Sequence, residues 1–110
     1  MGKPRYGYSM EGEIKMEVNT IIAGKQFSIE RLDNPTLFEE GGGGGVVPGN
    51  NKIVLFAGLR GKDELEVLAH EATHAHDMEL PEDFVEALAK DIANALWDYG
   101  YRVEHPELRI

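Results

Sequence analysis

Residues 70–74 read His-Glu-Ala-Thr-His, the HExxH pattern, and the rest of the chain is best interpreted outward from this pentapeptide. In an α-helix, residues four apart lie one above the other on the same face, so His70 and His74 can direct their imidazoles at one metal ion. Glu71 lies next to that face and can reach a water molecule on the metal. Sites that activate water with zinc combine such histidines with an open coordination position and a carboxylate. The pattern therefore predicts a helix that carries a zinc site.

The sequence around the pentapeptide predicts a helix over residues 62–78 with two distinct faces. Asp63 and Glu64 stand near its start, where acidic side chains suit the positive end of the helix dipole. The apolar stripe expected to face the core consists of Leu65, Leu68, Ala72 and Ala75. The side expected to face the metal carries Val67, His70, His74 and Asp77.

A second helix is predicted over residues 81–99. Pro81 is a favoured residue in a first helical turn, and Gly100 is a suitable stop just after the last turn. The stripe expected to be buried consists of Val85, Leu88, Ala89, Ile92, Leu96 and Tyr99.

The first half of the chain reads as β-structure. Residues 13–18 and 27–30 alternate polar and apolar side chains, as half-buried strands do, and residues 23–25 between them read as a hairpin turn. Residues 52–57 form a continuous apolar run and predict a well-buried strand. Together with the helices, these strands predict an α+β fold: a minimal zincin-like domain with a small antiparallel or mixed sheet, the HExxH helix and a second, C-terminal helix.

A single domain over residues 1–110 is expected from this length. Residues 1–10 are expected to be a loose arm, and residues 39–51 a flexible loop, because the five consecutive glycines within it cost much entropy to order. A mobile flap near a substrate groove is the alternative interpretation of that loop. Residues 101–110 are expected to be a loose tail, or alternatively to fold back over the cleft and make the protein latent.

Composition narrows the classes of partner. The chain has no cysteine, so a metal would be held by histidines and carboxylates. The formal net charge of −9 argues against nucleic acid as a partner, because phosphate binding needs a basic face. We see no candidate membrane span and no apolar signal sequence, so the expectation is a cytoplasmic protein without a membrane partner. Composition does not predict an oligomeric state.

The spacing after the pentapeptide excludes one class of zinc enzyme. A metzincin requires HExxHxxGxxH, with glycine at position 77 and histidine at position 80, whereas this chain has Asp77 and Leu80. His76 lies about 140° around the helix from the face of His70 and His74. We therefore interpret it as an exposed or supporting histidine.

Three carboxylates remain candidates for the third ligand. On the second helix, Glu82 borders the apolar stripe beside Ala89 and is favoured by position, while Glu86 lies further toward solvent. Asp77 is on the correct face of the first helix, where it can hold a histidine by a hydrogen bond or, less favourably, bind the metal itself. Alternatively, both glutamates are solvated charges, with Glu82 placed to suit the helix dipole.

Residues 68–77 (LAHEATHAHD) and 81–89 (PEDFVEALA) resemble the small gluzincin-type metallopeptidases of phages, prophages and archaea, which include the ImmA/IrrE-like family and the minigluzincins. The resemblance implies an antiparallel sheet before the HExxH helix and a glutamate from the second helix as third zinc ligand. In the ImmA/IrrE-like pattern, apolar or small residues follow that glutamate at +3, +6 and +7. Counting from Glu82 and counting from Glu86 both satisfy this pattern.

The expected function is zinc-dependent hydrolysis of a peptide or protein substrate, with Glu71 as the general base. The strand ending near Phe56 is the expected edge for pairing with an extended substrate. Residues near or beyond the end of the second helix are candidates to stabilise the transition state: Tyr99, Tyr101, Arg102 and His105.

Two alternatives belong to other functional classes. One is a catalytically silent or latent zinc-binding module that acts by contacting a partner. The other is an interaction protein in which HExxH arose by chance and both histidines are structural. Catalysis is preferred because Glu71 has no purpose in a purely structural site.

Overall fold

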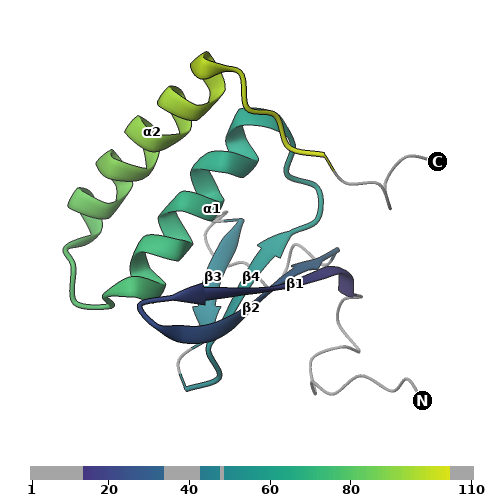
Figure 1. Ribbon diagram of the computed structural model, residues 1–110, viewed down its shortest axis with the longest axis vertical. Helices are drawn as coiled ribbons and strands as arrows, with labels where there is room; N and C mark the ends of the chain where they lie inside the picture. Colours follow the sequence, from purple (N-terminus) through teal and green to yellow (C-terminus); the bar gives the residue numbers. More distant parts are fainter. Residues whose placement is uncertain (1–13, 34–42, 48, 105–110) are drawn as a thin grey trace.

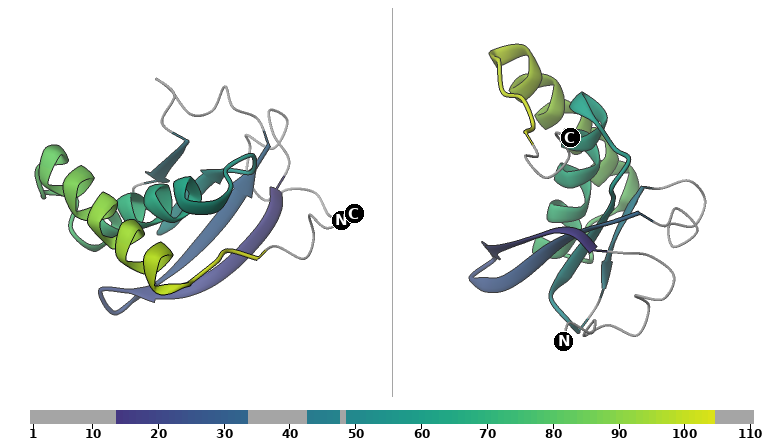
Figure 2. Two further views of the ribbon diagram at one scale, coloured as in Figure 1. Left: turned by 90° about the horizontal axis from the view of Figure 1, so that it is seen from above. Right: turned by 90° about the vertical axis from the view of Figure 1, so that its right-hand side faces the viewer.

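The structure is a computed structural model, and it describes residues 14–33, 43–47 and 49–104. A mixed sheet of four strands carries both helices on the same side (Figures 1 and 2). Helix α1 (Gly61–His76) packs on the sheet, and helix α2 (Glu82–Tyr99) packs on α1. The predicted α+β class is confirmed. Among the described residues, no helix is long and apolar enough to cross a membrane.

A β-hairpin opens the sheet. Strands β1 (Ile14–Ile22) and β2 (Lys25–Leu32) pair antiparallel, with Ile22 opposite Lys25. The two residues of the turn, Ala23 and Gly24, have φ angles of 53° and 78°. Two successive positive φ angles are typical of the tight turn whose twist matches that of the strands. The predicted turn is therefore present, and both strands are longer than the alternating pattern indicated.

The strand order is β1-β2-β4-β3. It corrects the expected position of the sheet edge and the expectation that residues 39–51 form only a loop. Strand β4 (Lys52–Phe56) lies parallel to β2 and antiparallel to β3 (Gly44–Val47), so the strand ending at Phe56 is central and β3 forms the edge. The flexible loop expected over residues 39–51 contains this strand. Gly44 and Gly45 pair with Leu55 and Val54 of β4. The two β-branched valines that follow them, residues 46 and 47, favour a strand and continue the same pairing.

Several segments named in the sequence analysis lie outside the described residues. These are the expected loose arm at residues 1–10, the first two glycines of the glycine run (residues 41–42), and residues 105–110 of the expected tail.

The core lies between the sheet and α1. Phe27, Ile53 and Leu55 are buried there, and side chains of α1 pack against them. Burial of each large apolar side chain contributes about 1.5–3 kcal/mol to folding. The α1 residues in this contact are Val67, Leu68, Ala72 and Ala75. The predicted stripe is thus largely present, with Val67 added from the side assigned to the metal.

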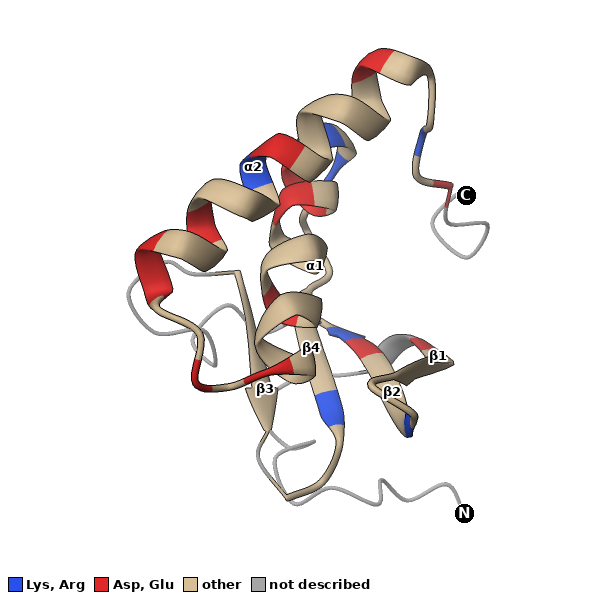
Figure 3. Ribbon diagram, turned by 60° about the vertical axis from the view of Figure 1, so that its left-hand side comes forward, with Lys and Arg blue, Asp and Glu red and all other residues tan. Residues whose placement is uncertain are grey.

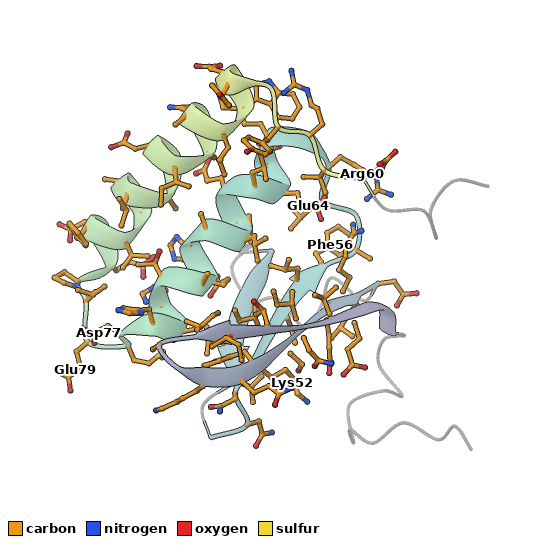
Figure 4. The ribbon with its side chains drawn as sticks, viewed as in Figure 1. Lys52, Phe56, Arg60, Glu64, Asp77 and Glu79 are labelled. Atoms are coloured by element: carbon orange, nitrogen blue, oxygen red, sulfur yellow. The ribbon has the colours of Figure 1, made fainter. Side chains whose placement is uncertain are left out.

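A buried arginine fixes the loop that leads into α1. Arg31 of β2 is fully buried, and its Nη2 donates hydrogen bonds to the carbonyl oxygens of Ala57 (2.6 Å) and Leu59 (3.2 Å). Its Nε lies 3.7 Å from the carboxylate of Glu64, which is also buried. Figure 4 shows Glu64 in the first turn of α1. Glu64 was expected to serve the helix dipole, and its burial ties the start of α1 to the sheet.

Helix α2 ends at Tyr99 with Gly100 just after it, as predicted, and it begins at Glu82, one residue after the predicted start at Pro81. Gly100 has a φ of 119°, and its N–H donates to the carbonyl oxygens of Leu96 and Trp97. The predicted buried stripe is wrong at Ile92, which is 36% exposed. It is wrong by the most at Tyr99, which is 83% exposed. The reason is the length of α1: Trp97 already lies against its first residue, Gly61, so Tyr99 projects beyond its end.

Candidate metal centre

The last turns of α1 and the first turn of α2 bring three potential ligands together. His70 and His74 lie one helical turn apart, with ring centroids 4.9 Å apart. Their Nε2 atoms face the Glu82 carboxylate at 3.1 Å (His70) and 2.8 Å (His74). The three ligand atoms all lie within 4.8 Å of one another. One ion can therefore contact two imidazoles and one carboxylate at this point.

A tight turn between the helices explains why Glu82 reaches the histidines over only eight residues. The backbone N–H of Leu80 donates to the carbonyl of Asp77, and that of Val85 donates to the carbonyl of Pro81. Helix α2 thus starts directly beside the end of α1. Because Glu82 is its first residue, the carboxylate lies at the level of His74.

The side chain of Asp77 stabilises this turn. Its backbone leaves the helical conformation, with a φ of −153°, and its Oδ1 accepts a hydrogen bond of 3.0 Å from the backbone N–H of Glu79. Figure 4 shows both residues in the connection between the helices. Within the described part of the chain, the group of close ligand atoms contains Glu82 and neither Asp77 nor Glu86.

The site opens into a cavity of about 470 Å³ between β3, α1 and α2. Its lining is acidic: four glutamates contribute to it, together with one histidine, one valine and one glycine. The lining residues are Gly44, Glu66, Val67, His70, Glu71, Glu82 and Glu86. Figure 3 shows acidic residues recurring along both helices.

Glu71 lines this cavity, and its pKa is raised there. Burial raises the pKa of its carboxyl above the usual 4.5. The neighbouring His70 and His74 oppose this increase in pKa, and the Glu82 carboxylate adds to it. A raised pKa suits a general base, which must both accept a proton and release it again.

Gly44 of β3 is a part of the site that sequence reasoning assigned to a loop. A Cβ atom at this position would lie 2.9 Å from Cγ1 of Val67 and 3.1 Å from Cδ2 of Leu55. Glycine therefore allows β3 to approach α1 beside His70. The available sequence signal was the Val46-Val47 pair, which continues the glycines as a strand.

Those residues considered for transition-state stabilisation that the structure describes lie away from the cavity. Tyr99 is separated from Glu82 by the length of α2, a rise of about 25 Å. Tyr101 stacks on Tyr99 near that far end, and Arg102 lies 3.8 Å over the ring of Trp97. His105 lies outside the described residues.

His76 lies on the opposite side of α1 from the site, as helical geometry predicts. It borders an apolar groove of about 660 Å³ between the tip of the β1–β2 hairpin and the two helices. The two faces of α1 are therefore chemically distinct, one lined by acids and histidines and the other by aliphatic side chains.

Comparison of the chain with protein-family models, curated proteins and solved structures finds no match. The resemblance to small gluzincins therefore depends on residues 68–77 and 81–89 themselves.

The donor set fits zinc. Two neutral imidazoles and one carboxylate form a common ligand set of catalytic Zn²⁺ sites, whereas Mg²⁺ and Ca²⁺ prefer oxygen ligands alone. Both histidines present Nε2 to the same point, and Glu82 faces them from a second helix. Three protein ligands leave a coordination position open on a tetrahedral ion.

Proposed function

We propose that this protein is a zinc-dependent metallopeptidase of the gluzincin type, with His70, His74 and Glu82 as ligands and Glu71 as the general base. The observation that carries the proposal is the position of Glu82. Its two carboxylate oxygens face the Nε2 atoms of the two HExxH histidines, although it comes from another helix.

Each side chain has a defined part in hydrolysis. When bound, zinc lowers the pKa of water and polarises a peptide carbonyl. Glu71 accepts a proton from the attacking water and delivers it to the nitrogen of the departing amine.

The edge strand β3 supplies a place for the substrate main chain. Among the described residues, β3 pairs with β4 on one side only, and its first residue, Gly44, lines the cavity. An extended peptide can add to such an edge through main-chain hydrogen bonds. This assigns to β3 the role that the sequence analysis gave to the strand ending at Phe56.

A second candidate function is a catalytically silent zinc-binding module. It is favoured by one feature of the cavity: within the described part of the chain, the lining contains no tyrosine, arginine or lysine. Such side chains commonly stabilise the negative charge that develops on the substrate oxygen. Catalysis without them would depend on zinc and on backbone N–H groups.

Cleavage of a peptide library separates the two functions. We expect zinc-loaded wild type to cleave peptides, and Glu71→Gln to keep its zinc while losing about 10²–10⁴-fold in rate. Glu79→Gln is the matched control, because it removes an exposed carboxylate from the turn outside the cavity. Wild-type protein that holds zinc and cleaves no peptide would favour the silent module.

A further inference from the structure

The proposed chemistry does not use the carboxylate of Glu86, which lines the cavity. Glu82 faces the two histidines, and Glu71 is the proposed base. The Glu66 carboxylate pairs with Lys90 at 3.2 Å. Glu86 is exposed at the cavity wall, and among the residues that the structure describes it makes no hydrogen bond or ion pair.

Glu86 lies where a side chain of a bound peptide could reach it. It follows Glu82 by four residues on α2, so the two side chains lie on the same face about 6 Å apart along the helix axis. An extended peptide rises about 3.3 Å per residue. If a peptide runs through the cavity along α2, with the cleaved bond beside Glu82, its side chains one or two residues away lie at the level of Glu86.

The charges around Glu86 favour a cation. No lysine or arginine of the described chain lines the cavity, while four glutamates do. The next basic residue along α2, Lys90, is paired with Glu66 of α1. That pair reduces the availability of Lys90 to neutralise Glu86, so a cationic group from outside the chain can do so.

We propose that Glu86 is a specificity-determining residue that selects substrates with a lysine or arginine one or two residues from the cleaved bond. This inference rests on the proposed peptidase function and names its substrate class. It also gives separate roles to the two glutamates that the sequence pattern left equivalent: Glu82 faces the metal position and Glu86 faces the substrate side chain.

Peptide hydroxamates test the inference without turnover, because the hydroxamate binds zinc and fixes the register of the peptide. We would compare matched tripeptide hydroxamates that carry lysine or norleucine one or two residues from the chelating group. Both directions of extension are needed, so that each side of the cleaved bond is sampled. Affinities would be measured by calorimetry on zinc-loaded wild type, Glu86→Gln and the control Asp91→Asn, which removes an exposed charge from α2 outside the cavity.

We expect a lysine compound to bind wild type and Asp91→Asn about fivefold more tightly than its norleucine counterpart, the effect of one solvent-accessible ion pair. Glu86→Gln should bind both compounds alike. Equal binding by wild type at every position, or a lysine preference that survives in Glu86→Gln, would overturn the role of Glu86 while leaving the peptidase proposal intact. Absence of both zinc and hydroxamate binding would overturn the peptidase proposal and this inference with it.

Discussion

The chemistry of Glu71 depends on where α1 places it. It follows a proposed ligand directly in sequence, so its side chain enters the same cavity from the neighbouring side of the helix. Burial disfavours its charged form, and the nearby Glu82 carboxylate adds to that effect. The position is therefore unfavourable for the stability of the metal-free protein and favourable for a proton acceptor.

This cost has a measurable pH dependence. The pKa of Glu71 is raised in the folded protein above its usual 4.5, so the folded state binds this proton more tightly than the unfolded state does. The contribution of Glu71 to stability is therefore most favourable below pH 4.5 and is lost as pH rises through the folded pKa. We expect metal-free Glu71→Gln to be more stable than wild type at neutral pH, with the difference shrinking as pH falls toward 4.5. Urea unfolding of both proteins across this range would measure it, and a difference that grew on acidification would contradict the account.

At the scale of elements, edge strand β3 is what sequence reasoning recovered least well. Two of its four residues are glycines, and periodicity is not detectable in so short a segment. The hairpin and both helices were predictable because alternation, helical periodicity, Pro81 and Gly100 agree with the structure. The burial of Glu64 could not be predicted, because its partner Arg31 lies far away in sequence. Register between distant segments depends on such tertiary contacts.

The close approach of β3 to α1 predicts unequal effects of two adjacent substitutions. Gly44→Ala places a methyl group 2.9 Å from Val67 and should destabilise the protein by about 1–3 kcal/mol. In Gly45→Ala the nearest atom, Cγ2 of Val54, is 4.0 Å away, so this variant should be neutral or slightly stabilising. Chemical denaturation of the pair would show the contrast, and equal stability would argue against the described packing.

The buried pair of Arg31 and Glu64 predicts a larger effect. Glu64→Gln leaves a buried guanidinium with less compensation and should cost about 3–5 kcal/mol. Lys90→Gln, which breaks the exposed pair with Glu66, should cost no more than about 1 kcal/mol. The free energies of unfolding, measured in denaturant, would distinguish the two. A Glu64→Gln variant as stable as Lys90→Gln would show that this pair does not fix the start of α1.

At the scale of the whole molecule, the proposed ligands come from two helices that also pack on each other. Helix α2 packs chiefly on α1, through the small side chains of Ala89 and Ala93 and the valine Val85. A metal bound to His70, His74 and Glu82 would link the end of α1 to the start of α2. Metal binding should therefore stabilise the fold as well as supply chemistry.

Thermal unfolding tests this coupling. Free zinc at about one hundred times its dissociation constant should stabilise the folded state by about 2.7 kcal/mol, and a chelator should reverse the effect. The rise in Tm on addition of zinc should be much smaller in Glu82→Gln than in wild type. In the control Asp91→Asn it should equal that of wild type. A Tm that does not respond to zinc in wild type would contradict a link between the helices.

The central claim is that Glu82 completes a zinc site with the two HExxH histidines. Its most direct test is the zinc content, by mass spectrometry, of wild type, Glu82→Gln and Glu86→Gln after loading and dialysis. Because Glu82 faces both Nε2 atoms and Glu86 stands one turn away, we predict about one zinc per chain in wild type and Glu86→Gln and far less in Glu82→Gln. Equal zinc content in the two variants, or none in wild type, would contradict the account.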